Sequence, residues 1–175
     1  YPGQETVFEL DETYRWREID QRTAFVAIAG FGPGQLATIH VFNSAFKQLG
    51  LNIRCLPIEV GNLKKLPKML DTLKIRAIVA SGGLGQQLIP LAEHIDKHDQ
   101  QSRYLNLLLK RDDGWHGYNT LWRSGLKELE SQLGEQGLDR QNVMILGNGG
   151  IAQSMVYAAS QRKGLVSICG PGDTE

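Results

Sequence analysis

The chain alternates short apolar runs with segments of helical periodicity, and this alternation restricts the folds open to it. The apolar runs predict buried strands at 24–29, 53–56, 77–80, 104–109, 142–146 and 165–169, with a further short strand at 115–119. The helical periodicity predicts helices at 38–49, 63–73, 87–95, 122–133 and 150–161. Strands separated by helices favour a mostly parallel sheet covered by helices on both faces. The predicted fold class is therefore α/β.

The same patterns divide the chain into three predicted parts. Residues 1–22 are polar and lack sustained periodicity, so we interpret them as a linker or the tail of an upstream segment. Residues 23–135 form one α/β domain, and residues 136–175 give a single βαβ unit. A complete dinucleotide-binding domain needs about 100 residues more than this unit supplies. We therefore expect an incomplete second domain, and the first residue, which is not Met, also suggests a fragment or a processed chain.

Charge and composition exclude several kinds of partner. The 19 basic and 19 acidic residues balance and the isoelectric point is near 7.1, so no electrostatic footprint for nucleic acid or an acidic membrane is present. No apolar run approaches the length of a membrane span, and the N-terminus does not resemble a signal peptide. Cys55 and Cys169 lie in apolar runs far apart, which favours buried, reduced thiols in a cytoplasmic protein.

A glycine-rich turn is the strongest local motif. After the strand predicted at 142–146 comes Gly147-Asn148-Gly149-Gly150-Ile151-Ala152, a G-x-G-x-x-A pattern at the start of a predicted helix. Such glycines allow a pyrophosphate to approach the backbone, and the helix N-terminus offers free N–H groups. The alternative is a tight strand-to-helix turn without a ligand. The residues after the next strand, 169–172, contain neither the acid that selects NAD nor the Arg that selects NADP.

Other polar residues give weaker signals. His94 and His98 have the i, i+4 spacing of metal ligands on a predicted helix, but no third ligand is evident, so a solvated helix face is favoured and no metal site is predicted. His40 is interpreted as a packed or capping histidine, and Asp112-Asp113 as a turn rather than a catalytic pair. No Ser/His/Asp or Cys/His constellation can be argued.

Several motifs together resemble the shikimate dehydrogenase family over about residues 22–170. They are the strand followed by Gly30-Phe31-Gly32-Pro33, the helix Ile39–Phe46, the box Gly117-Tyr118-Asn119-Thr120 and the turn Leu146–Gly150. The resemblance implies a three-layer αβα substrate-binding domain followed by the start of a Rossmann-like NADP-binding domain. It implies NADP-dependent interconversion of shikimate and 3-dehydroshikimate. It also assigns a shikimate-like substrate to Asn106, Asn119 and Thr120, and NADP to Gly147, Asn148, Gly149, Gly150, Ile151 and Ala152.

The departures from the family pattern fall on the chemistry. The position of the family's catalytic Lys is Leu84, and that of its catalytic Asp is Leu121. In the family an S-x-S pair binds the substrate carboxylate, and this chain has Gly34-Gln35-Leu36 there. The family's substrate-contacting Asn is followed by Thr, whereas Asn106 is followed by Leu107. No catalytic residue is therefore assigned. Three interpretations stay open: an active dehydrogenase domain, an inactive domain kept as scaffold or ligand sensor, and a site rebuilt for a less polar substrate.

The N-terminal residues extend the resemblance to a fusion protein. Residues 1–4 resemble the P-G-Q tail of type I 3-dehydroquinate dehydratase, and residues 14–17 the linker of bifunctional dehydratase–shikimate dehydrogenase proteins. This implies a covalently fused dehydratase domain and a role in aromatic amino acid biosynthesis. Assembly as a homodimer stays open.

Overall fold

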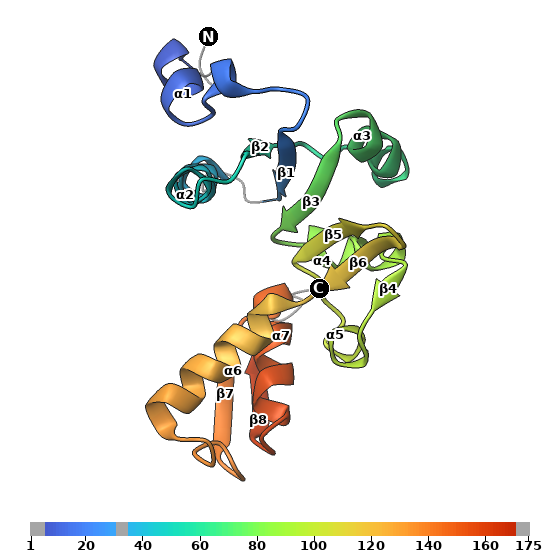
Figure 1. Cartoon of the computed structure of the whole chain (residues 1–175). Helices are drawn as coiled ribbons and strands as arrows, with labels where there is room; N and C mark the ends of the chain where they lie inside the picture. Colours follow the sequence, from blue (N-terminus) through green and yellow to red (C-terminus); the bar gives the residue numbers. More distant parts are fainter. Residues whose placement is uncertain (1–5, 31–34, 171–175) are drawn as a thin grey trace. The chain divides into compact units, whose positions relative to one another are not determined.

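The computed structural model describes residues 6–30 and 35–170, and its contacts divide the chain into two compact units, residues 1–80 and 81–175 (Figure 1). Each unit is described by itself. Within the described ranges, no helix is long and apolar enough to cross a membrane.

The first unit is built around three parallel strands. Its elements in order are α1 Val7–Glu12, η1 Trp16–Glu18, β1 Ala24–Ala29, α2 Gln35–Gln48, β2 Ile53–Pro57, η3 Leu63–Lys65, α3 Leu66–Thr72 and β3 Ile75–Ala80. β1 lies in the centre and pairs in parallel with β2 on one side and with β3 on the other. This confirms the strands and helices predicted between residues 24 and 80, with bounds that differ by at most three residues.

A buried amide joins α2 to β2. Asn43 is 3% exposed. Its Nδ2 donates to the carbonyl of Cys55 at 3.0 Å, and its Oδ1 accepts the N–H of Cys55 at 2.7 Å. The Asn43 side chain thus makes the two backbone hydrogen bonds at Cys55 that a neighbouring strand would otherwise make. Ile28, Ile39 and Cys55 form the core beside it.

The segment before residue 22 is more ordered than its polarity suggests. α1 begins at Thr6 with a capping box, in which Glu9 N–H bonds Thr6 Oγ1 at 3.1 Å and Thr6 N–H bonds Glu9 Oε2 at 2.7 Å. Tyr14 is 5% exposed and belongs to the core of the first unit. A helix of six residues is too short to leave a detectable period. The assignment of 1–22 to an upstream domain stays a prediction, and residues 1–4 lie outside the described part.

The second unit contains a mixed sheet and a separate βαβ unit. Its elements are α4 Leu84–Gln87, η4 Ile89–Leu91, β4 His94–Ile95, α5 Lys97–Gln101, β5 Leu107–Arg111, β6 Gly114–Tyr118, α6 Thr120–Leu133, β7 Asn142–Leu146, α7 Gly150–Ser160 and β8 Leu165–Cys169. β5 and β6 form an antiparallel hairpin, and β4 pairs with β6 in parallel. β7 and β8 are parallel and joined by α7. Parallel pairs dominate, as expected for an α/β fold.

One predicted helix is wrong. The segment predicted as helix 87–95 contains the end of α4, the 3₁₀ turn η4 and the two-residue strand β4. Pro90 lacks the N–H that a continuing helix needs, so the helical turn ends early. The strand predicted at 104–109 begins later, at Leu107, because Tyr104 and Leu105 are used for packing instead.

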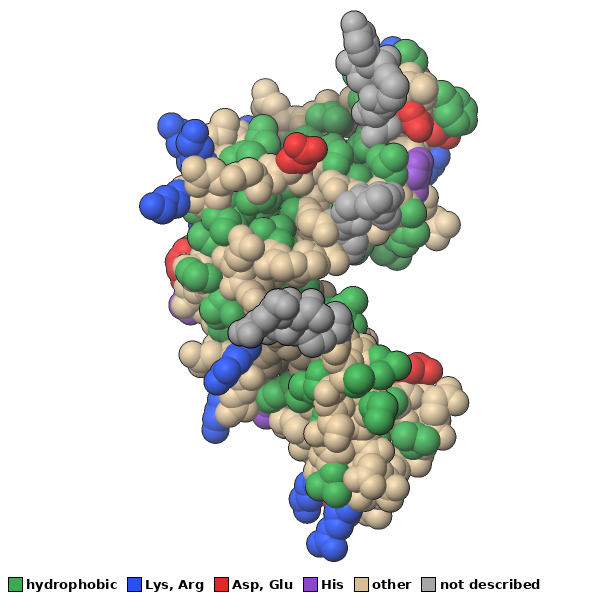
Figure 2. Space-filling model, turned by 180° about the vertical axis from the view of Figure 1, so that it is seen from behind, with side chains coloured by type: hydrophobic (Ala, Val, Ile, Leu, Met, Phe, Trp, Pro, Cys, Tyr) green, Lys and Arg blue, Asp and Glu red, His purple; other side chains and the backbone are tan. Residues whose placement is uncertain are grey.

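The βαβ unit is covered on one face. α6 packs against α7, and α7 packs against β7 and β8 (Figure 1). Val143 joins Leu126, Leu138 and Ala158 in a small core. On the other face of β7, Met144 is 71% exposed, and hydrophobic side chains reach the surface over this part of the molecule (Figure 2).

The two cysteines differ in burial, which corrects one expectation. Cys55 is fully buried and Cys169 is exposed, and both are free thiols. Burial raises the pKa of the Cys55 thiol to about 12. We expect a thiol-specific chromogenic disulfide at pH 8 to titrate Cys169 alone, with Cys55 reacting only after denaturation. The variant Cys169→Ser should show no fast phase; rapid modification of two thiols in the native chain would contradict this.

Candidate functional site

The glycine turn connects the end of β7 to the start of α7. Gly147 has φ +118°, which favours glycine, and its N–H donates to the carbonyl of Cys169 at 2.8 Å. Gly149 is the N-cap of α7, and no described side chain caps it. No described atom lies within 4 Å of the place where a Gly149 Cβ would stand. The turn therefore presents an uncapped helix N-terminus beside open space, the arrangement that binds phosphate groups.

Two glycines pack against one buried tyrosine ring. A Cβ on Gly85, in α4, or on Gly150, at the start of α7, would collide with the ring of Tyr104. Tyr104 is 1% exposed, and its hydroxyl donates to the carbonyl of Gly82 at 3.1 Å. Burial raises the pKa of this phenol. The ring thereby fixes the positions of α4 and α7 relative to the segment that leads into β5.

Asn106 and Thr120 bond one another reciprocally. Asn106 Nδ2 donates to Thr120 Oγ1 at 2.8 Å, and Thr120 N–H donates to Asn106 Oδ1 at 2.7 Å. Thr120 begins α6 and is exposed, whereas Asn106 is half-buried. The structure thus brings together two of the three residues predicted to contact substrate. Their contact with a ligand stays a prediction.

The two leucines predicted to stand at the family's catalytic positions each lie in the first turn of a helix. Leu84 starts α4 next to Gly85, whose carbonyl accepts the N–H of Leu105 at 3.3 Å. Leu121 follows Thr120 in the first turn of α6. Both leucines are half-buried. Since an aliphatic side chain has no proton to exchange, neither position can act as a general acid or base.

Asn119 has a structural role in this fold. The side chain is fully buried, and its Nδ2 donates to Ser102 Oγ at 2.9 Å and to Ser154 Oγ at 3.0 Å. Its Oδ1 accepts the N–H of Leu121 at 3.0 Å, which caps α6. All the amide atoms are used within the protein, so Asn119 ties α6 to α7 and to the loop after α5. Its predicted contact with substrate has not been tested.

Removal of this amide is expected to be costly. We expect Asn119→Ala to lower the free energy of unfolding by about 2–3 kcal/mol, because a helix cap is lost and two buried hydroxyls lose a partner. Asn62→Ala is the matched control, since Asn62 caps an exposed 3₁₀ turn through Lys64 N–H at 2.9 Å. Urea denaturation of both variants checks this. Equal losses would show that the buried network contributes nothing beyond capping.

Charged groups fix the start of α6 against α5. The buried carboxylate of Asp99 accepts a hydrogen bond from Trp122 Nε1 at 2.9 Å and pairs with Arg123. Arg123 also pairs with Asp96, the N-cap of α5, at 2.6 Å. Partial burial opposes ionisation of Asp96, but the N–H of Asp99 and the charge of Arg123 outweigh it and lower its pKa.

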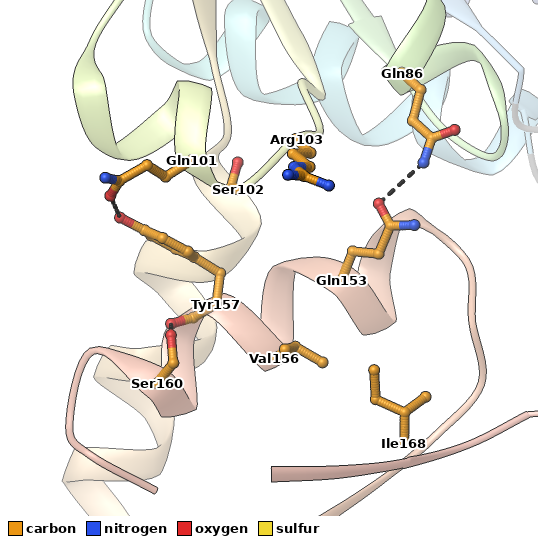
Figure 3. A pocket seen from close by; sticks show the side chains of 9 residues that line it. All are labelled: Gln86, Gln101, Ser102, Arg103, Gln153, Val156, Tyr157, Ser160 and Ile168. Carbon is orange, nitrogen blue, oxygen red and sulfur yellow. Dashed lines mark hydrogen bonds between the residues drawn. The ribbon is translucent and has the colours of Figure 1, made fainter. Parts of the chain in front are cut away.

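A pocket of about 420 Å³ runs along α7. Figure 3 shows Gln86 and Gln153 facing one another across it, with Nε2 of Gln86 donating to Oε1 of Gln153 at 3.0 Å. Tyr157 closes another side and donates to Oε1 of Gln101 at 3.1 Å. Gln153 lies one turn beyond Gly149, so the pocket adjoins the glycine turn. Sequence patterns did not single out these polar side chains, because glutamines on helix surfaces carry no distinguishing spacing.

The remaining predicted residues are placed as follows. Asn148 is exposed beside Gly170, Ile151 is 61% exposed, and Ala152 is packed inward at 9%.

Three further candidates outside the turn, His40, His94 and His98, also have defined places. His40 is exposed rather than packed, and its Nδ1 bonds Thr13 Oγ1 at 2.9 Å. The prediction that His94 and His98 share a helix is wrong, because they lie in β4 and α5, although both are exposed as expected.

The glycine turn between a parallel strand and a helix defines the class of this part of the chain: a Rossmann-like βαβ unit. No family model matches the chain. Curated relatives nevertheless point to one family.

The shikimate dehydrogenase (NADP(+)) of Aquifex aeolicus is 27% identical over 143 residues, which cover 80% of this chain and 52% of the relative. The pentafunctional AROM polypeptide of Yarrowia lipolytica is 26% identical over 165 residues, 89% of this chain and 10% of that protein. The chain spans about half the length of the first shikimate dehydrogenases that it matches, 52% and 48%.

Solved structures agree with these relatives. The crystal structure of the Aquifex aeolicus shikimate dehydrogenase superposes with a TM-score of 0.78 at 23% identity, covering 89% of this chain and 59% of that one. A shikimate dehydrogenase in complex with NADP+ gives 0.75 at 22% identity, covering 88% and 53%. The resemblance to the shikimate dehydrogenase family is therefore supported in sequence and in fold.

Proposed function

We propose that the chain is a shikimate dehydrogenase-like domain that binds NADP and a shikimate-like molecule but lacks the groups for proton transfer. The observation that carries the proposal is the uncapped glycine turn at the start of α7. The predicted correspondence of Leu84 and Leu121 to the family's catalytic positions supports the lack of proton transfer. The curated relatives named for NADP-dependent shikimate dehydrogenase support the choice of ligands.

The residues of the turn fit a dinucleotide. Backbone N–H groups of 150–152 form the first turn of α7, and the open space at Gly149 admits a pyrophosphate close to the backbone. When bound, NADP supplies a hydride acceptor or donor. The turn's part is to hold the phosphates. An acid or Arg that would distinguish NAD from NADP is not found in the described residues after β8, which end at Gly170.

Asn106 and Thr120 would orient the second ligand. Their amide and hydroxyl can bond the hydroxyl groups of a shikimate-like ring, and Asn119 holds the backbone beneath them. A positioned acid–base group typically contributes about 10²–10⁴-fold to a rate. Because leucines stand at positions 84 and 121, both acid–base groups of the family would be missing, which favours binding without turnover. An active dehydrogenase is the second candidate, favoured by the names of the relatives.

The biological setting follows from the same resemblance. Similarity to a pentafunctional AROM polypeptide supports a role in the shikimate pathway, and fusion to a 3-dehydroquinate dehydratase, a cytoplasmic location and a homodimer belong to this proposal. In such a fusion the domain would act as a scaffold or a ligand sensor.

The test is shikimate-dependent reduction of NADP, followed at 340 nm with the chain at micromolar concentration. We expect no reduction above a protein-free control. Ordinary turnover would overturn the inactive assignment and favour the dehydrogenase.

A further inference from the structure

Two histidines and an aspartate converge at the edge of the second unit's mixed sheet. His94 and His116 are register partners on the neighbouring parallel strands β4 and β6, and their rings stack with centroids 4.5 Å apart. Asp113 lies in the turn between β5 and β6, confirmed as a turn. Three side chains of types that commonly bind metals therefore lie close together, one from β4, one from the β5–β6 turn and one from β6.

The distances suit one small ion. His116 Nε2 lies 2.8 Å from Asp113 Oδ1, and His94 Nε2 lies 3.6 Å from Asp113 Oδ2. One ligand atom from each residue lies within 4.8 Å of the other two. Tetrahedral zinc, with bonds of about 2.0–2.1 Å, requires ligand atoms about 3.3 Å apart. His94 and Asp113 are exposed and His116 is half-buried.

The surroundings favour a cation. The carboxylate of Glu93 lies against Gly114, next to Asp113. A pocket of about 410 Å³ lined by Glu93, His94 and His116 leaves room for water on the ion.

We propose that His94, Asp113 and His116 bind a divalent transition metal ion such as Zn²⁺, with water completing the coordination. Two imidazoles and one carboxylate suit zinc and its neighbours rather than Ca²⁺ or Mg²⁺, which prefer all-oxygen sites. The ion would tie β4, a strand of only two residues, to the β5–β6 hairpin.

The test is titration of the chelator-treated chain with Zn²⁺ in competition with a chromophoric chelator, and with Co²⁺ followed by its visible absorption. We expect one equivalent to bind with micromolar or tighter affinity. His116→Ala and Asp113→Ala should each weaken binding at least about tenfold, because a ligand is lost. Matched controls are Asp112→Ala, in the same turn, and His98→Ala, outside the cluster. Both should keep wild-type affinity.

Circular dichroism verifies that each variant is folded. Loss confined to His116→Ala and Asp113→Ala supports the site. Absence of saturable binding below about 100 μM, or equal affinity in wild type and His116→Ala, would overturn it and leave a hydrogen-bonded cluster only. NADP binding is measured separately, so failure of this site and failure of the proposed function can be told apart.

Discussion

Replacing Gly150 with alanine is expected to lower the free energy of unfolding by about 3 kcal/mol, at the upper end of overpacking costs. A methyl group there would collide with the ring of Tyr104, which is fully buried. The ring has no room to move away, because it also packs against Gly85 and its hydroxyl donates a hydrogen bond to the carbonyl of Gly82. Urea denaturation followed by tryptophan fluorescence measures the loss, since Trp115 and Trp122 lie in the same unit.

Gly149→Ala is the matched control for this prediction. The two glycines are adjacent, but a Cβ at Gly149 meets no described atom and its φ of −74° suits any residue. We expect a change within about 1 kcal/mol, from the weaker N-cap preference of alanine. Equal destabilisation by the two variants would show that the contact with Tyr104 does not determine the need for glycine.

The double variant Leu84→Lys with Leu121→Asp is expected to raise shikimate-dependent NADP reduction at least about 100-fold above the rate of the protein-free control. The physical reason is that a proton must leave or join the substrate hydroxyl as hydride moves, and leucine can do neither. Leu121 follows Thr120 in α6, and Leu84 precedes Gly85, whose carbonyl accepts the N–H of Leu105 next to Asn106. We therefore expect the two introduced groups to enter the same site. Absorbance at 340 nm measures the rate.

Each single variant is the control for the double one. We expect either alone to recover less than the pair, because the two groups act on one proton. If the double variant stays at background while NADP still binds, the two leucines do not account for inactivity. If wild type already turns over at an ordinary rate, the placement of the catalytic positions is wrong.

Elements with a clear local apolar pattern could be predicted from the sequence, and those that depend on pairing with distant residues could not. The strand at 24–29, the strand at 142–146 and the helix at 122–133 follow from apolar spacing alone. The predicted helix at 87–95 failed because Pro90 ends the turn and β4 forms only by pairing with β6. Such pairing depends on residues 22 positions away, which local patterns do not contain.

The position of the glycine turn between a strand and a helix could be predicted from the sequence, but the contacts that support it could not. G-x-G-x-x-A directly after a strand identified the start of α7. The role of Tyr104 between two glycines, and the buried bonds of Asn119, arise only when α4, α6 and α7 come together. The cluster of His94, Asp113 and His116 was likewise hidden, since its spacing reflects sheet register rather than sequence distance.

Fluorescence titration of the chain with NADPH measures whether the glycine turn binds a dinucleotide. We expect a saturable change in NADPH emission for wild type. The affinity should be at least about tenfold weaker in Gly149→Ala, because its methyl group would occupy the space left for the pyrophosphate. No saturable change in the folded wild-type chain, or identical binding by the two proteins, would contradict the claim that this glycine turn holds a dinucleotide.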